Sequence, residues 1–297
     1  MDAHNDLLLG VFANYSFSWL ECYLTSLSRC GFKGRKVFIV WNLSDEVRTR
    51  LIQYGFELVE IPPRTNCTVT FAADFFRIRD YLAHEYLKAH YKEFRYVLWL
   101  DIRDLVFQIN PIPWLEQYLY PHKLVVASEC ILIKDETCND GWVKAIYPKE
   151  TYEALREHEV LNAGTFAGTS EAMLDVFAYL TDTANRFPGD ITEQAALNFI
   201  LREPEFKDIT KVPRMSEGFA AVGYGFGDKL QHVWTDQCPI LNHTDGMLYP
   251  VGKSEPFTIV HQYDRHPEWK TVISSHYTVG MIPPPPRSLR NSRRPPR

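Results

Sequence analysis

The stretch YVLWLDIRDLVF, residues 96–107, decides the fold that the sequence predicts. It begins with a continuous apolar run from Val97 to Leu100, which is typical of a strand covered on both faces inside an α/β domain. Asp101 interrupts this run at the C-terminal end of the strand, where open α/β sheets bind their ligands. Asp104 follows three residues later. One turn can therefore direct both carboxylates at a single point.

Two carboxylates placed in this way can hold a divalent cation. Mg²⁺ and Mn²⁺ bind oxygen, and proteins hold such hard ions with one or two carboxylates while substrate phosphates fill other positions. A simpler interpretation is that Asp101 caps a turn and that Asp104 pairs with Arg103, because Asp-containing turns are common after strands. This stretch alone leaves both interpretations open.

Length and composition indicate a soluble globular protein with one main domain. A chain of 297 residues can bury a sizeable core, and we place one α/β domain at residues 1–280. The net charge of -5 argues against a nucleic-acid partner. Residues 281–297 are rich in proline and arginine, which predicts a disordered tail with a weak attraction for an anionic membrane surface.

The cysteines and the apolar segments indicate the compartment. The six cysteines include no CxxC pair and no histidine at zinc-finger spacing, so we expect reduced thiols. No early stretch looks like a secretory signal, and no run approaches the roughly 18 apolar residues of a membrane span. We therefore expect a cytoplasmic enzyme without a transmembrane segment, at most peripheral to a membrane through its tail.

Strands and helices alternate along the first half of the chain, as a parallel sheet requires. Apolar patterns predict strands at 7–13, 37–41, 56–61 and 123–128, and helices from 17 toward Gly31, at 46–54 and at 71–89. Residues 129–149 are charged and have no clear period, which predicts a surface loop near a site. The many glycines and short apolar runs of residues 211–260 predict an appended antiparallel region.

The segment VLNAGTFAG, residues 160–168, is the second informative stretch. It predicts a strand with small residues, including Ala163 and Gly164, that allow a ligand to approach the backbone. Tight packing of strand against helix explains the same residues. Helices are expected at 170–184 and 190–201, and the second opens with Asp190 and Glu193 in capping-box spacing.

Three further residues have an ordinary structural explanation beside a functional one. His261 ends an apolar strand at 257–260, and a lone histidine there more often satisfies a local hydrogen bond than binds a metal. Arg77 and Arg79 lie off the apolar stripe of helix 71–89. Solvated arginines are the usual explanation, and a clamp on a pyrophosphate is the functional one.

Four segments taken in order resemble a GT-A glycosyltransferase: DIRDLVF at 101–107, LNAGTFAG at 161–168, ITEQAALN at 191–198 and IVHQYD at 259–264. The resemblance covers about residues 7–266 and is nearest to the type with a DxxD aspartate pair, as in the glycosyltransferase domain of collagen lysyl hydroxylases and related bacterial proteins. It implies a Rossmann-like, mostly parallel central sheet flanked by helices, with a smaller antiparallel C-terminal region.

The resemblance also implies which residues form the site. Both aspartates and the late histidine would hold Mn²⁺, which suggests Asp101, Asp104 and His261. The nucleotide base would meet the end of the first strand, and the sugar would meet the small-residue strand. The expected substrate contacts are Phe12, Ala13, Asn14, Arg77, Arg79, Asp101, Asn162, Gly164 and Gln194. Many members carry Asp-Gln where this chain has Glu193-Gln194, so the catalytic carboxylate stays open between Glu193 and Asp190.

Physical reasoning leads to the same function. Transfer of a sugar from a nucleotide donor requires the diphosphate leaving group to be neutralised, and a cation held by two carboxylates and an imidazole supplies that charge. The imidazole favours Mn²⁺ over Mg²⁺, which prefers all-oxygen surroundings. We therefore predict a metal-dependent glycosyltransferase with a nucleotide-sugar donor, a UDP-sugar being favoured, and an acceptor hydroxyl on a glycan, a lipid-linked glycan or a small molecule.

Two alternatives from other functional classes remain. One is a metal-dependent nucleotidyltransferase or phosphohydrolase that uses Asp101 and Asp104. The other is a non-catalytic protein of the same fold that binds a nucleotide sugar without consuming it.

Overall fold

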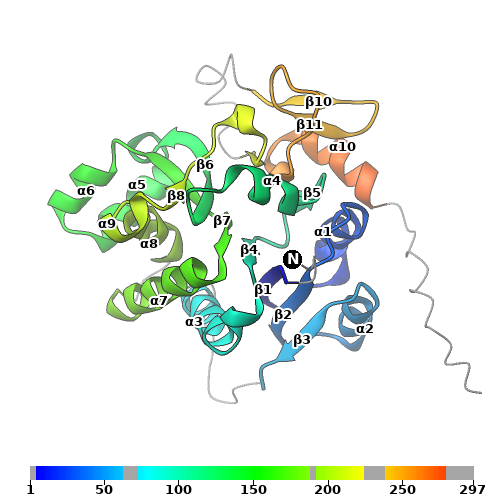
Figure 1. Cartoon of the computed structure of the whole chain (residues 1–297), viewed down its shortest axis with the longest axis horizontal. Coiled ribbons are helices and arrows are strands. Elements are labelled where there is room, and N and C mark those ends of the chain that lie inside the picture. The colour runs from blue at the N-terminus through cyan, green and yellow to red at the C-terminus, as the bar shows by residue number, and fades with distance from the viewer. Residues whose placement is uncertain (1–4, 63–72, 188–191, 224–237, 279–297) are drawn as a thin grey trace, which may run out of the picture.

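The computed structural model describes residues 5–62, 73–187, 192–223 and 238–278. Its centre is a seven-stranded sheet of order β3-β2-β1-β4-β7-β6-β8 (Figure 1). The strands are β1 (Leu7–Ala13), β2 (Arg35–Trp41), β3 (Glu57–Glu60), β4 (Tyr96–Leu100), β6 (Leu124–Leu132), β7 (Glu159–Thr169) and β8 (Thr210–Lys211). Strand β4, which holds the apolar run before Asp101, thus forms the middle of the sheet.

The sheet is mostly parallel, as predicted. Strands β3, β2, β1 and β4 run in one direction, and β8 is parallel to β6. Strand β7 reverses this order, because it is antiparallel to both of its neighbours, β4 and β6. The alternation of strands and helices does not reveal this reversal, since strand direction depends on how the chain returns to the sheet.

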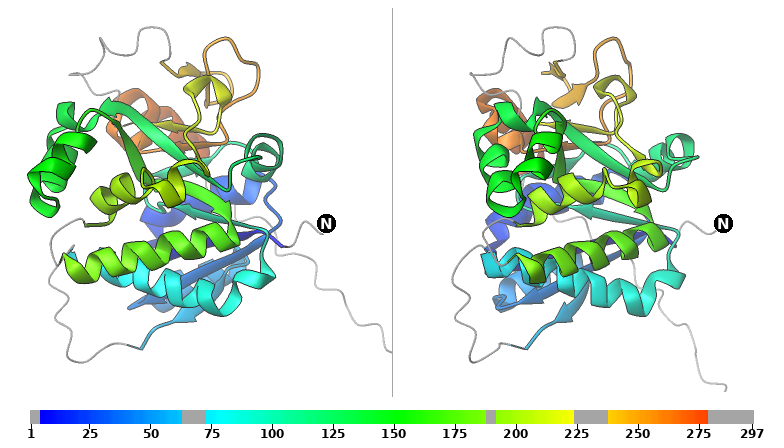
Figure 2. Two further views of the ribbon diagram at one scale, coloured as in Figure 1. Left: turned by 60° about the vertical axis from the view of Figure 1, so that its left-hand side comes forward. Right: turned by 90° about the vertical axis from the view of Figure 1, so that its left-hand side faces the viewer.

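Helices cover both faces of the sheet, which explains the continuous apolar runs of its central strands. One face carries α1 (Phe17–Arg29), α2 (Asp45–Gln53) and α4 (Pro111–Tyr118). The other carries α3 (Ala73–His90), α7 (Ser170–Arg186) and α8 (Thr192–Ile200). Figure 2 shows α3 and α7 side by side on this second face. In β1, Leu8 and Phe12 enter the first core while Leu7, Leu9 and Val11 enter the second.

A second, three-stranded sheet brings the C-terminal part of the chain to the central strand. Its order is β5-β12-β9, with β5 (Leu105–Phe107), β12 (Ile259–His261) and β9 (Ala220–Val222). Strand β12 is antiparallel to β5, so that His261 lies opposite Leu105. Because β5 begins directly after Asp104, this pairing carries the late histidine to the aspartates.

The C-terminal region matches its prediction in part. Strands β10 (Ile240–Asn242) and β11 (Met247–Tyr249) form an antiparallel pair, as expected for residues 211–260. The expectation is wrong for β9, which is parallel to β12. The remaining described helices are α5 (Thr137–Ile146), α6 (Lys149–Leu155), α9 (Pro204–Lys207) and α10 (Pro267–Tyr277), and α10 packs against α1.

The prediction of a surface loop at residues 129–149 is wrong. Strand β6 extends to Leu132, and α5 follows and packs against α8. The strand is hard to recognise because Cys130 adopts a positive φ of 58° and the register against β7 shifts around it. Helix α5 begins after Glu136, whose carboxylate accepts a hydrogen bond of 2.6 Å from the backbone N–H of Asn139.

Two sequence predictions fall outside the described residues. The tail at 281–297 is one, and Asp190 at the start of the late helix is the other. Within the described ranges, none of the helices combines the length and the apolar character of a membrane span.

Candidate functional site

Asp101, Asp104 and His261 form one cluster above the end of β4. The Nε2 atom of His261 lies 3.3 Å from Oδ2 of Asp101 and 3.4 Å from Oδ1 of Asp104. One possible ligand atom from each residue lies within 4.8 Å of the other two. The structure thus brings together the three residues that the resemblance implied as metal ligands, although their positions in the sequence lie far apart.

The geometry of this cluster fits a divalent cation. His261 is buried, and among the described residues neither ring nitrogen makes a hydrogen bond. Its contacts with the two carboxylates are ion pairs without hydrogen-bond geometry. Three groups that face a common point without bonding to one another leave their lone pairs available to a metal. Two carboxylates and an imidazole suit Mn²⁺ better than Mg²⁺.

The simpler interpretation of the aspartates is also partly realised. Arg103 donates a hydrogen bond of 3.1 Å to Oδ2 of Asp104 and lies 3.7 Å from Asp264. This pairing uses one carboxylate oxygen of Asp104, and the other oxygen faces His261. The two interpretations are therefore compatible.

The charged groups of the cluster shift one another's pKa values and so stabilise the ionised forms. Burial tends to raise the pKa of the Asp101 carboxyl, but Arg79 and His261 outweigh it and hold this pKa well below its usual range. Against the same cost of burial, His261 lowers the pKa of Asp104. Burial would lower the pKa of His261, yet Asp104 and Asp101 outweigh burial and raise it to about 9. A histidine that ligates a metal must lose this proton.

Gly164 on β7 has no side chain, and the side chains of Asp101 and His261 occupy the space next to it. Its carbonyl oxygen accepts a hydrogen bond of 2.9 Å from the backbone N–H of Asp101. A Cβ atom at this position would lie 2.6 Å from Cε1 of His261 and nearer still to Oδ2 of Asp101. The small residue is therefore needed for close approach of side chains to the β7 backbone.

Replacing Gly164 with alanine is expected to disturb the cluster. The new methyl group must displace the Asp101 carboxylate or the His261 ring, so Gly164→Ala should raise the Mn²⁺ concentration for half-maximal effect by about 10-fold, as for other changes beside metal ligands. The measurement is a Mn²⁺ titration of melting temperature. Gly141→Ala on α5 is a matched control, since a Cβ there meets nothing within 4 Å. Equal Mn²⁺ requirements in both variants would contradict the prediction.

Two cavities meet at the cluster. The first has a volume of about 270 Å³ and lies between the ends of β1 and β4. The second has about 260 Å³ and lies beside β7, α5 and α8. Both are lined by Arg79, Asp101, Gln262 and Arg265. A ligand that spans them would cross the cluster at its middle.

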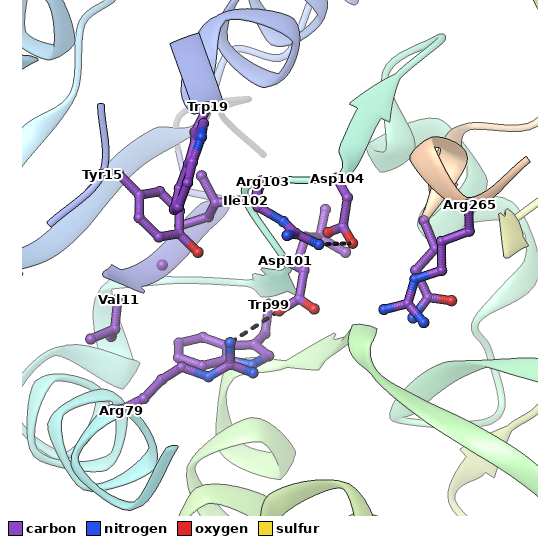
Figure 3. A pocket seen from close by; sticks show the side chains of 13 residues that line it. Val11, Tyr15, Trp19, Arg79, Trp99, Asp101, Ile102, Arg103, Asp104 and Arg265 are labelled. Atoms are coloured by element: carbon purple, nitrogen blue, oxygen red, sulfur yellow. Dashed lines mark hydrogen bonds and ion pairs between the residues drawn. The ribbon is translucent and has the colours of Figure 1, made fainter. Parts of the chain in front are cut away.

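Aromatic side chains form one wall of the first cavity. Figure 3 shows Tyr15 and Trp19 on one side, Arg265 on the other, and Asp101 between them. The rings of Tyr15 and Trp19 meet edge to face, with 5.3 Å between their centroids. Trp19 is largely exposed, so the wall continues to the mouth of the cavity.

Arg79 connects the cluster to the second cavity. One guanidinium nitrogen donates to Asp101 at 3.0 Å, and another donates to Glu193 at 2.7 Å. Burial alone would lower the pKa of Arg79, but Glu193 and Asp101 outweigh it and raise this pKa above its ordinary value. The side chain is thus a charged link between a cluster aspartate and the predicted catalytic carboxylate.

Amide side chains fix the small-residue strand that forms the floor of the second cavity. The side chain of Gln194 accepts a hydrogen bond of 2.8 Å from the backbone N–H of Ala163. Asn162 accepts from the N–H of Gly164 at 3.0 Å and donates to Glu129 at 2.8 Å. These bonds replace strand pairing where the register between β6 and β7 breaks. They hold Gly164 in position beside Asp101.

The expected substrate contacts are distributed unevenly. Five of them, Arg79, Asp101, Asn162, Gly164 and Gln194, line the second cavity, and so does the predicted catalytic residue Glu193. Neither cavity is lined by Phe12, Ala13 or Asn14, and the first is lined instead by their neighbours Gly10, Val11 and Tyr15. Arg77 lies on α3, and its side chain belongs to the part that the structure does not describe.

Glu129 and Arg265 also line the second cavity, and neither is among the residues predicted from the sequence. Glu129 is preceded by the apolar run of β6. A carboxylate after an apolar strand is also the pattern at Asp101, so the sequence carries a signal for Glu129. Arg265 lies four residues beyond His261 and has no pattern of its own.

No family model matches the sequence, and no curated protein matches it. The fold, however, is similar to that of solved glycosyltransferases. An active-site mutant of LgtC gives a TM-score of 0.55 at 12% identity over 91% of this chain and 95% of that chain. The galactosyltransferase LgtC in complex with donor and acceptor sugar analogues gives 0.51 at 14% identity over 91% and 95%. GlyE of Streptococcus pneumoniae TIGR4 gives 0.51 at 14% over 92% and 63%. These likenesses establish the GT-A fold.

Proposed function

We propose that this protein is a metal-dependent glycosyltransferase that moves a sugar from a nucleoside-diphosphate donor, a UDP-sugar being favoured, to an acceptor hydroxyl. The observation that carries the proposal is the cluster of Asp101, Asp104 and His261 at the junction of two cavities. Together the cavities reach the range of small-molecule sites, about 300–1,000 Å³. The likeness to solved glycosyltransferases supports the same reaction class.

The chemistry of each cavity suits one half of such a donor. Tyr15 and Trp19 offer aromatic surface on which a nucleobase can stack. The polar second cavity suits a sugar, whose hydroxyls both donate and accept hydrogen bonds. Arg265 lies where the cavities meet and suits the diphosphate, because a guanidinium binds phosphate oxygens in a forked geometry.

The residues of the cluster have defined roles in this proposal. Asp101, Asp104 and His261 would hold Mn²⁺, or Mg²⁺ as a substitute, and the bound cation would supply positive charge to the diphosphate leaving group. Arg79 keeps Asp101 ionised and oriented. Glu193 is the proposed catalytic carboxylate, because it lines the second cavity, and Asp190 is the alternative.

The proposal also includes a more specific family likeness and a cellular location. The DxxD spacing of Asp101 and Asp104 underlies the likeness to the glycosyltransferase domain of collagen lysyl hydroxylases. A cytoplasmic location, with at most peripheral membrane contact through the tail, remains our expectation. A nucleotidyltransferase or phosphohydrolase would use the same two aspartates but has no need of a second polar cavity beside them.

A screen of nucleotide sugars tests the proposal directly. With Mn²⁺ present, UDP and UDP-sugars are expected to raise the melting temperature by several degrees, because a ligand that binds only the folded state stabilises it. UMP is the matched control, since it lacks the second phosphate, and it should have little effect. Slow hydrolysis of the donor should release UDP and free sugar. Release of UMP would instead indicate a phosphohydrolase, and the absence of any Mn²⁺-dependent stabilisation by UDP would refute the proposal.

A further inference from the structure

Gln262 lies at the junction of the two cavities, directly after His261 in the sequence, and it lines both of them. Its backbone N–H donates a hydrogen bond of 2.7 Å to the carbonyl oxygen of Asp104. Its carbonyl oxygen accepts a hydrogen bond of 3.1 Å from the backbone N–H of Arg265. Both polar groups of its backbone are thus used within the protein. The side-chain amide is the part of Gln262 that remains for a ligand.

The amide of Gln262 is buried, and its oxygen is not satisfied. The residue is only 8% exposed, and among the described residues Oε1 has no hydrogen-bond partner. Most buried polar side-chain atoms in proteins have a partner, because a buried atom without one destabilises the folded state. An exception in the wall of two cavities is a place where a ligand group can supply the missing hydrogen bond.

The backbone of Gln262 is also unusual. It adopts a φ of 56° and a ψ of 31°, in the left-handed region. Glycine adopts this conformation easily, and asparagine does so with a short side chain that can bond locally, as at Asn14 and Asn42. Glutamine has neither advantage. The chain therefore keeps a long amide where glycine would suit the backbone better, and such strain is concentrated at functional sites.

A diphosphate at the junction would satisfy only half of this amide. Phosphate oxygens can accept a hydrogen bond from Nε2, but an ionised phosphate has no hydrogen to donate to Oε1. A hydroxyl group can donate. In a nucleotide sugar the diphosphate is attached to C1 of the sugar, so the hydroxyl on C2 is the sugar hydroxyl nearest to the junction.

We infer that Gln262 binds the transferred sugar at the junction, with Oε1 accepting a hydrogen bond from the C2 hydroxyl, and that this contact selects a donor with a free hydroxyl at C2. The inference rests on the proposed function. A donor that lacks this hydroxyl leaves Oε1 without a partner in the complex as well. Sites that hydrogen-bond a substrate hydroxyl discriminate against analogues without it for this reason. Gln262 is thus a specificity-determining residue, distinct from the metal ligands and from Glu193.

A matched pair of donors tests the contact by affinity. Calorimetry with Mn²⁺ present compares UDP, whichever of UDP-glucose and UDP-galactose binds more tightly, and the 2-deoxy analogue of that donor. Loss of the C2 hydroxyl should weaken binding to the wild type about 10-fold, the usual effect of an unpaired buried polar group. Gln262→Met keeps the length of the side chain but offers only a weak acceptor, so it should bind both donors about equally. Gln53→Met on exposed α2 is the matched control and should keep the wild-type preference.

The stability of the ligand-free protein separates this role from a structural one. Gln262→Met removes a buried oxygen that has no partner, so the variant should melt no lower than the wild type. A structural role predicts instead a lower melting temperature together with an unchanged preference for the C2 hydroxyl. If Gln262→Met does not fold, Gln262→Gly gives the same comparison of donors, because glycine suits the left-handed backbone.

The outcomes distinguish this inference from the proposed function. If UDP does not bind in the presence of Mn²⁺, the proposed function itself fails. If UDP binds, the inference alone is overturned by any of three results: neither sugar nucleotide binds more tightly than UDP, the wild type binds the 2-deoxy analogue as tightly as its parent, or Gln262→Met keeps the wild-type preference.

Discussion

Asp104→Asn is expected to abolish Mn²⁺-dependent turnover, with a fall of about 1,000-fold or more in kcat/KM. The substitution keeps the size of the side chain but removes the negative charge that faces His261 at 3.4 Å. A neutral amide is a poor ligand for a hard cation, and losing the Lewis acid removes several kcal/mol of transition-state stabilisation. Since Arg103 also lies near Asp264, its guanidinium keeps a partner, and the fold should remain intact.

Metal binding and turnover separate this effect from a loss of folding. The wild-type protein should gain thermal stability from Mn²⁺ and lose activity in EDTA, whereas Asp104→Asn should show neither response. Asp182→Asn is the matched control, because it breaks only an exposed ion pair with Arg186 and should cost less than about 1 kcal/mol. Normal activity of Asp104→Asn in EDTA would eliminate the cluster as the catalytic metal site.

The sequence predicts the part of the site that lies within one segment. The apolar run of β4 requires cover on both faces, and the structure confirms cores on both sides of the sheet. Asp101 and Asp104 then follow from their place at the end of that strand. The small residues of β7 were also recognised, but the sequence did not separate close packing from ligand approach. The structure shows that Gly164 makes room for the side chains of Asp101 and His261.

Contacts between distant segments could not be predicted from local sequence patterns. His261 reaches the aspartates because β12 pairs with β5, although 151 residues lie between Phe107 at the end of β5 and Ile259 at the start of β12. No local pattern specifies such a pairing. Likewise, Glu129 enters the second cavity at an irregular part of β6, where Cys130 has a positive φ. In an irregular strand, apolar and polar residues do not alternate regularly, so the sequence pattern predicts a loop there.

Two buried carboxyl groups, Asp80 and Glu193, lie close together at the second cavity. Asp80 on α3 is 1% exposed, and its Oδ1 has no hydrogen-bond partner among the described residues. Burial and the charge of Glu193 raise the pKa of Asp80 well above its usual range. Burial also raises the pKa of Glu193, but the ion pair with Arg79 at 2.7 Å opposes this shift. We therefore expect Glu193 to carry the charge and Asp80 to hold a proton.

A substitution at Asp80 can serve as a control, because the direction of its effect on stability follows from the raised pKa. When a carboxyl group has a higher pKa in the folded than in the unfolded protein, the folded protein becomes less stable as the pH rises above the unfolded-state pKa. For aspartate this unfolded-state pKa is near 3.9. Asp80→Asn replaces a protonated acid with a neutral amide of the same shape. The variant should therefore melt no lower than the wild type at pH 7, and its turnover should be close to normal because Asp80 lines neither cavity.

Glu193→Gln is expected to lower kcat by about 100-fold, the usual effect of a lost acid–base or charge-stabilising group. The carboxylate lines the second cavity and is 3% exposed, so it lies where the sugar reacts in the proposed function. Glutamine keeps the shape and can still accept from Arg79, so a purely structural role predicts nearly normal kcat. Asp80→Asn alters a buried neighbour of Glu193 without touching the cavity, and Asp190→Asn tests the alternative carboxylate. A large fall in Glu193→Gln alone assigns the chemistry to Glu193. Equal falls in Glu193→Gln and Asp80→Asn would show that the buried charge balance, rather than a catalytic carboxylate, controls turnover.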